Sequence, residues 1–157
     1  MVKHPYALTK KIMKHLLYTC LVLLAFTQGC KKKEQISPEL HSINKLKHTW
    51  TLGIDGYVKI DGQDITSDYT EFQITFTAQG ELKIFEVQNG GNAFPMTTDT
   101  WTYEGTNYER IVRGDGVVMD AIITNSTLDL TFNKPIPSGG RVEGTYGNFE
   151  FHLNLQE

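Results

Sequence analysis

An alternation of apolar and polar residues, repeated every second position from residue 47 onward, constrains this chain more than any other feature. Its clearest instance is 149–155, which reads Phe-Glu-Phe-His-Leu-Asn-Leu, and the segments 72–76 and 128–132 follow the same pattern. Successive side chains of a β-strand point to opposite faces, so each such segment has one face for a core and one for water. No stretch of this region keeps a helical period. The pattern therefore predicts an all-β fold.

Short polar segments rich in Gly, Asn and Asp separate the alternating runs. They divide the chain into predicted strands at 70–78, 81–87, 99–104, 107–113, 117–124, 127–133 and 149–155. Glycine, Asn and Asp supply the backbone conformations of tight hairpins, and loops this short make consecutive strands antiparallel neighbours. A first strand is predicted through Trp50, Leu52 and Ile54, while 57–60 either continues it past a bend or forms a short second strand.

A meander of about eight strands avoids exposed edges when it closes on itself. We therefore expect residues 46–157 to form a small up-and-down antiparallel barrel. The formal charge supports one acidic domain here: the chain has 15 Lys and Arg against 18 Asp and Glu. Four of the lysines (Lys3, Lys10, Lys11 and Lys14) precede residue 30, which leaves 11 basic residues and a charge of −7 after it. Such a balance argues against a nucleic-acid partner.

Residues 1–29 have the organisation of a secretory signal peptide. A positively charged region with Lys10, Lys11 and Lys14 precedes an apolar run from Leu16 to Phe26. The run is shorter than the roughly 20 apolar residues of a transmembrane helix, and lysines follow it at 31–33. We expect this segment to be removed on export.

Phe26-Thr27-Gln28-Gly29-Cys30 resembles a bacterial lipobox, although Thr27 and Gln28 depart from its usual residues. The resemblance implies that Cys30 is lipidated and becomes the first residue of the mature chain. Several acyl chains hold a protein on a membrane stably, whereas one binds reversibly. Residues 30–45 are predicted to be a flexible tether. An acidic stretch just after the cysteine directs some lipoproteins to the outer face of the outer membrane, and Lys-Lys-Lys-Glu-Gln at 31–35 contains a single acidic residue. We therefore expect an outer-membrane lipoprotein at the periplasmic face.

A wider resemblance covers about Leu46 to Leu155. The motifs that carry it are Leu46-x-x-Thr49-Trp50, Asp61-Gly62-x-Asp64-x-Thr66-x-x-Tyr69, Phe76-x-x-x-Gly80, Trp101-x-Tyr103, Leu128-x-Leu130-x-Phe132 and Gly144-x-Tyr146-Gly147-x-Phe149-x-Phe151. Together they resemble the lipocalin-like domain of small bacterial envelope lipoproteins. They are mostly core and turn residues, so they imply a fold more than a function.

No motif for catalysis or cofactor binding occurs in the chain, and we predict neither an enzyme nor a metal site. His41, His48 and His152 lack metal-ligand spacing. Asp61, Asp64 and Asp68 suit either a turn or a calcium loop, with the turn favoured because the order of an EF-hand is missing. Asp120, between Val118 and Ile122, is expected to pair with Arg110 or Arg113.

The predicted barrel interior leaves two functional hypotheses. Five inward aromatic residues are candidates for binding a ligand, namely Trp50, Phe76, Trp101, Tyr103 and Phe151. In the first hypothesis the lipoprotein binds a small apolar ligand or a segment of an envelope protein without catalysis. In the second, a filled barrel without ligand acts as an accessory part of an envelope complex. An interior cavity above roughly 300 Å³ would favour the first, and a filled barrel with an exposed patch at Val118 and Ile122 the second.

Overall fold

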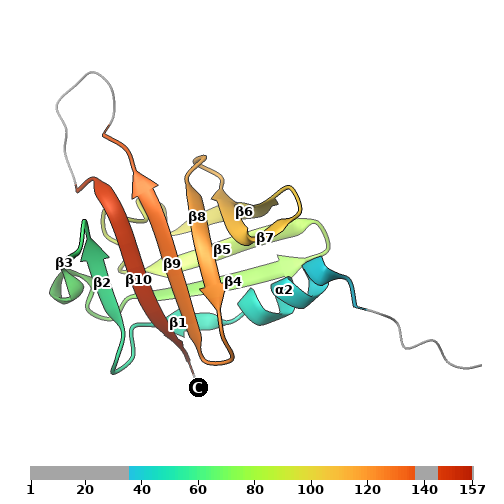
Figure 1. Ribbon diagram of the computed structural model, residues 1–157, viewed down its shortest axis with the longest axis horizontal. Helices are drawn as coiled ribbons and strands as arrows, with labels where there is room; N and C mark the ends of the chain where they lie inside the picture. Colours follow the sequence, from blue (N-terminus) through green and yellow to red (C-terminus); the bar gives the residue numbers. More distant parts are fainter. Residues whose placement is uncertain (1–35, 137–144, 157) are drawn as a thin grey trace, which may run out of the picture. The chain divides into compact units, whose positions relative to one another are not determined.

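The computed structural model of the protein describes residues 36–136 and 145–156 (Figure 1). Within them lie one α-helix, one short 3-10 helix and ten strands. The elements are α2 (Pro38–Leu46), β1 (Thr49–Thr51), β2 (Tyr57–Ile60), β3 (Gln63–Asp64), η1 (Thr66–Tyr69), β4 (Gln73–Gln79), β5 (Leu82–Gln88), β6 (Thr98–Glu104), β7 (Asn107–Arg113), β8 (Val118–Ile123), β9 (Thr127–Lys134) and β10 (Gly147–Leu155).

Eight of these strands form a closed antiparallel barrel. Strands β4 to β10 pair in chain order, and β1 closes the ring by pairing with both β4 and β10. The β1–β10 contact is short, with Trp50 opposite Leu155 and Thr51 opposite Asn154. The prediction of an all-β, up-and-down barrel of about eight strands is confirmed. The turn segments fall where the polar breaks placed them, and the strand ends differ from prediction by a few residues.

The segment 57–60 is a separate strand rather than a continuation of the first one. As β2 it pairs with the first half of β10, and β3 pairs with β2 in turn. Strand β10 consequently has three neighbours: β9 along nearly its whole length, and β2 and β1 along successive parts of it. Leu52 ends the buried part of the first strand, and Ile54 lies in the following turn with its side chain fully exposed (100%). The predicted inward position of Ile54 was therefore wrong.

Helix α2 corrects the prediction of a flexible tether through residue 45. Ser37 caps its first turn by accepting a hydrogen bond from the Leu40 amide at 3.1 Å, and Pro38 occupies the first helical turn. Ile43 and Leu46 are spaced to lie on one face, and both are buried. The helix has only two buried apolar residues, too few for a sustained helical period in the sequence. A tether consequently ends at or before Ser37.

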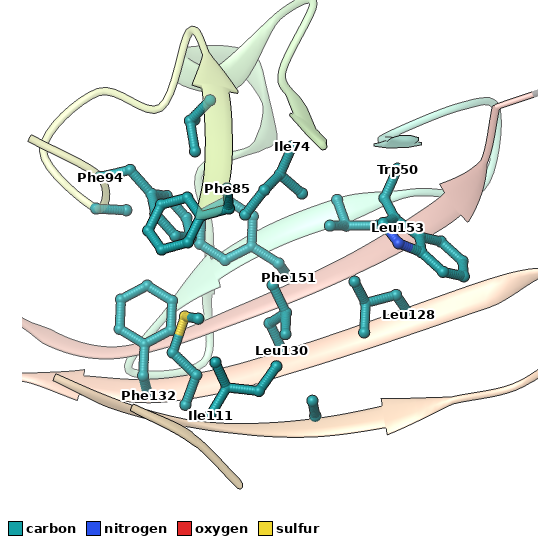
Figure 2. Packing of buried hydrophobic residues seen from close by; sticks show 14 of the residues in the cluster. Trp50, Ile74, Phe85, Phe94, Ile111, Leu128, Leu130, Phe132, Phe151 and Leu153 are labelled. Carbon is teal, nitrogen blue, oxygen red and sulfur yellow. The ribbon is translucent and has the colours of Figure 1, made fainter. Parts of the chain in front are cut away.

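The core runs from one end of the barrel to the other, and the two ends differ. At the α2 end, Ser42 donates a hydrogen bond to the Tyr108 carbonyl, and Glu39 forms an ion pair with Lys83 at 2.8 Å. The opposite end is covered by the β5–β6 loop (residues 89–97), and we call it the loop end. Figure 2 shows Trp50 and Phe94 far apart in this core, with Phe151 and Leu153 between them.

Candidate functional site

The five aromatic residues predicted to bind a ligand all point into the barrel, but they do not surround one common space. Trp101 lies between Phe76 and Tyr103, with ring centroids 5.9 and 5.3 Å away. Phe151 belongs instead to a cluster of phenylalanines toward the loop end, where its ring is 4.9 Å from that of Phe72. Trp50 packs beside α2. All five are buried and in contact with other side chains.

The polar groups of these aromatic residues already have partners. Trp50 donates its indole hydrogen to the Leu46 carbonyl at 3.0 Å, and Trp101 donates to the Ile84 carbonyl at 3.1 Å. The Tyr103 hydroxyl is 3.0 Å from the Ser42 hydroxyl. Burial raises the pKa of Tyr103 above its usual value of 10.0, with the Ser42 hydrogen bond opposing the shift. These groups hold the core and α2 together, and whether any of them contacts a ligand stays a prediction.

Arg113 is an inward-pointing cation at the loop end that the sequence analysis did not identify as buried. Arg113 is only 5% exposed, because it lies on β7 opposite Trp101 and, like Trp101, points into the barrel. Its Nη1 donates to the Ala93 carbonyl at 3.0 Å and its Nη2 to Asp115 at 2.5 Å. The guanidinium carbon lies 4.9 Å from the ring centre of Phe94 and 5.7 Å from that of Phe132. Aromatic faces and a carboxylate thus stabilise a charge that burial alone would disfavour.

Two buried polar atoms at this end have no hydrogen-bond partner among the described residues. They are Nε of Arg113 and Oδ2 of Asp99. Asp99 precedes Trp101 by two positions on β6 and therefore also faces inward, while its Oδ1 accepts from the Thr100 amide at 2.7 Å. A side chain at Gly114 would clash here, because a Cβ would lie 2.1 Å from Oδ1 of Asp99. Buried unpaired polar atoms are uncommon in folded proteins and mark this end as a candidate binding site.

Lys134 places a second cation at the loop end. Its ammonium donates to the Asn92 carbonyl and lies 5.3 Å from the ring centre of Tyr146. Burial lowers the pKa of Lys134 below its usual value of 10.5, and the charge of Arg113 lowers it further, while Asp115 opposes both. The two cations are therefore close enough to repel each other, and the carboxylate of Asp115 offsets part of this repulsion.

A separate hollow of about 660 Å³ lies on the outer face of the sheet formed by β7 to β10. We call it the outer groove. Arg110, Asp115, Asp120, Thr131, Asn133 and Glu150 are among its lining residues. The predicted pairing of Asp120 is confirmed with Arg110, at 3.1 Å, rather than with Arg113. Arg110 also pairs with Glu104 at 2.5 Å, so its charge is matched by two carboxylates.

The two apolar residues expected to form an outer patch lie in different places. Val118 is half-buried and lines the outer groove. Ile122 is 64% exposed and borders a hollow of about 250 Å³ beside α2, with His41 and Lys45. The two residues therefore do not form one contiguous patch, and the outer groove is lined by both apolar and charged side chains.

His152 is a partly buried member of the outer face. Its Nδ1 lies 2.5 Å from Asp129, and its ring stacks on Tyr57 with centroids 5.3 Å apart. Lys59 lies over the other ring of this stack, 4.3 Å from the centre of Tyr57. The spacing of the histidines did not predict this cross-strand contact between β2, β10 and β9.

Two of the three aspartates at 61, 64 and 68 accept hydrogen bonds, Asp64 within its own turn and Asp61 from β10. Asp64 accepts hydrogen bonds from both the amide and the hydroxyl of Thr66, at 2.9 and 2.6 Å, and Asp61 accepts from the Asn148 amide at 3.0 Å. The side-chain hydrogen bond from Thr66, and then its amide, lower the pKa of Asp64 below 3.8. Across residues 36–136 and 145–156, no three His, Cys, Asp or Glu side chains gather as a metal site. This geometry is that of a turn.

Cys30 and the predicted signal peptide lie outside the described residues. No helix in the described part of the chain is long and apolar enough to cross a membrane. Comparisons of the chain with protein-family models, with curated proteins and with solved structures find no match.

Proposed function

We propose that this protein is a lipid-anchored, lipocalin-like lipoprotein of the outer membrane that binds a segment of another envelope protein in its outer groove. The observation that carries the proposal is the contrast between the two faces of the barrel wall. Inside, aromatic rings pack against one another. Outside, a hollow of about 660 Å³ is open to solvent and lined by more acidic than basic side chains. Specific binding requires such a concave surface with a few fixed polar groups.

The charges of the outer groove suggest the chemistry of its partner. Asp115, Asp120 and Glu150 contribute three carboxylates. Asp115 is paired with Arg113 and Asp120 with Arg110, so Glu150 is the one without an ion-pair partner among the described residues. Asn133 donates to Asn148 at 2.8 Å, and Asn148 contacts Asp61, so the amides of the groove are held in place. Complementary charge favours encounter and fixes orientation. The partner segment is accordingly basic.

The experiment introduces a photo-crosslinking residue at Thr131, in the groove, or at Thr102, which is outward and exposed on β6. Both variants are expressed in the native cells. Crosslinking from 131 and not from 102, lost when Asp120→Lys and Glu150→Lys are added, supports the proposal. Equal crosslinking from both positions, or crosslinking that survives the charge reversal, contradicts it.

Anchoring is tested separately by Cys30→Ser. The variant is expected to leave the membrane fraction, because no acyl chain remains to hold it. A variant that still sediments with membranes would contradict the lipid anchor without affecting the assignment of the outer groove. A protein that stays anchored but fails to crosslink would contradict the binding role of the outer groove without affecting the lipid anchor.

A further inference from the structure

Phe94 contributes a ring to the core from a loop rather than from a strand. It is 4% exposed and contacts four other phenylalanine rings. The centroid distances are 5.7 Å to Phe72, 6.1 Å to Phe85, 5.5 Å to Phe132 and 5.5 Å to Phe151. Figure 2 shows its side chain entering beside those of Phe85 and Phe151. These four residues, three on strands and Phe72 just before β4, form a cage around the Phe94 ring.

The loop that carries Phe94 is held at the barrel mainly through its backbone. Arg113 donates to the Ala93 carbonyl and Lys134 to the Asn92 carbonyl. The Phe94 amide donates to the Gly90 carbonyl at 3.1 Å. Gly90 has no room for a Cβ, which would lie 2.7 Å from the Cβ of Phe94, and Asn89 and Gly91 have positive φ values of 53° and 51°. The Asn-Gly-Gly turn therefore bends the loop so that Phe94 enters the cage.

Arg113 joins the cage to a charged site. Its guanidinium lies over Phe94 and Phe132, and its Nε has no acceptor among residues 36–136 and 145–156. Two further donors nearby, Nη1 of Arg113 and Nζ of Lys134, donate their hydrogen bonds to main-chain carbonyls of the loop, while Nη2 of Arg113 is paired with Asp115. Arginine and carboxylate match in geometry, and a charged acceptor binds such donors more strongly than a neutral carbonyl does.

We propose that Phe94 is a displaceable plug over a latent binding site for a small aryl carboxylate. The ligand ring takes the place of the Phe94 ring among Phe72, Phe85, Phe132 and Phe151. Its carboxylate accepts from Nη1 of Arg113 and from Nζ of Lys134 as the loop withdraws its two carbonyls. This site is distinct from the outer groove and does not depend on the function proposed for it.

The exchange replaces the ring contacts of Phe94 and the two hydrogen bonds that the loop carbonyls accept. One aromatic ring leaves the cage and another enters it, so the buried apolar area changes little. Two hydrogen bonds from charged donors to neutral carbonyls are replaced by hydrogen bonds from the same donors to a charged carboxylate. A ligand shifts a conformational equilibrium only by its differential affinity for the two states, and here the carboxylate supplies that difference. A neutral aromatic ligand would gain nothing over Phe94 itself.

The test uses the full-length chain with Phe94→Ala and two probes, phenylacetate and its neutral analogue phenylacetamide, measured by calorimetry. A buried apolar cavity of about 150 Å³ is enough to bind benzene. Phe94→Ala is expected to bind phenylacetate at least about tenfold more tightly than phenylacetamide. Phe76→Ala is the matched control, because Phe76 is equally buried but contacts Trp101 and Phe85 rather than Arg113. It is expected to show no preference for the carboxylate.

The wild-type protein tests whether the plug moves. It is expected to bind phenylacetate more weakly than Phe94→Ala, with faster amide exchange across residues 89–97 in the bound state. Equal affinity of Phe94→Ala for the two probes would overturn the role of Arg113. Unchanged exchange at about a thousand times the Kd of Phe94→Ala would overturn displacement. If Phe94→Ala does not fold, Phe94→Leu retains more of the packing and must show the same preference for phenylacetate.

Discussion

Replacing Leu46 with alanine tests whether α2 is part of the folded barrel. The Leu46 side chain is completely buried (0% exposed), and the helix also supplies the carbonyl that accepts from Trp50. The change removes three carbon atoms, worth about 0.8 kcal/mol each in transfer free energy, and leaves a cavity. We expect the free energy of unfolding to fall by about 3 kcal/mol. Helix propensity does not contribute to the loss, because alanine is the better helix former.

Leu40→Ala is the matched control, since Leu40 lies on the same helix but is 47% exposed. Its expected effect is within about 0.5 kcal/mol. The assay is urea unfolding followed by tryptophan fluorescence, which reports on Trp50 and Trp101 directly. Thermal unfolding should show a fall in Tm of roughly 10 °C for Leu46→Ala. If both variants lose the same small amount of stability, α2 is not docked and residues 38–46 are a tether after all.

Three further predictions concern single contacts. Tyr103→Phe removes the hydrogen bond to Ser42 and should lower the free energy of unfolding by about 1 kcal/mol. Because the pKa of Tyr103 is raised in the folded protein, the stability that the neutral phenol contributes is intact below pH 10 and is lost as the pH rises further. The variant should therefore lose less stability than the wild type in alkaline unfolding titrations. Gly114→Ala should destabilise the protein by about 1–3 kcal/mol in urea unfolding, because its Cβ meets Asp99 and Thr100, and a neutral result would show that the loop end rearranges freely. Thr66→Val should raise the pKa of Asp64 toward 3.8 in an NMR titration, and an unchanged value would mean that Thr66 does not bond to it.

The barrel strands could be predicted because each buries one face only. In β9 and β10 the buried and outward residues alternate without a break, and the paired strands share that alternation in register. The short turns then make each strand an antiparallel neighbour of the next one in the chain. Closure through β1 was expected from the number of strands, although its contact with β10 involves only two residue pairs. Local pattern and chain connectivity therefore suffice for most of the architecture.

The helix could have been found from its cap rather than from its period. Ser37-Pro38-Glu39 places a capping hydroxyl, a proline in the first turn and an acidic residue together, and Lys45 lies in the last turn. The same polar residues also suit a tether. What decides between the two is the burial of Ile43 and Leu46, which depends on a barrel end that forms elsewhere in the chain.

The candidate site at the loop end was harder to predict. The position of Arg113 follows from the alternation of faces along β7. Arg113 lies two residues after the buried Ile111 and shares its inward face, whereas Arg110 lies on the outward face with its partner Asp120. That rule separates the two arginines, but it does not predict that a buried guanidinium will be tolerated. Phe94 lies in a loop with no periodicity, so nothing local shows that its ring enters the core. Its position depends on the cage and on backbone bonds to residues far along the chain.

Strand β10 sets the order in which this protein can complete its fold. It follows the other described strands in the chain, yet it pairs with β9, β2 and β1, and its contact with β1 joins residues about one hundred positions apart. Until it is available, β9, β2 and β1 each have an unpaired edge, and long-range pairing of this kind is slow. The barrel can therefore close only once β10 has paired along both of its sides, and a chain without β10 would keep three open strand edges.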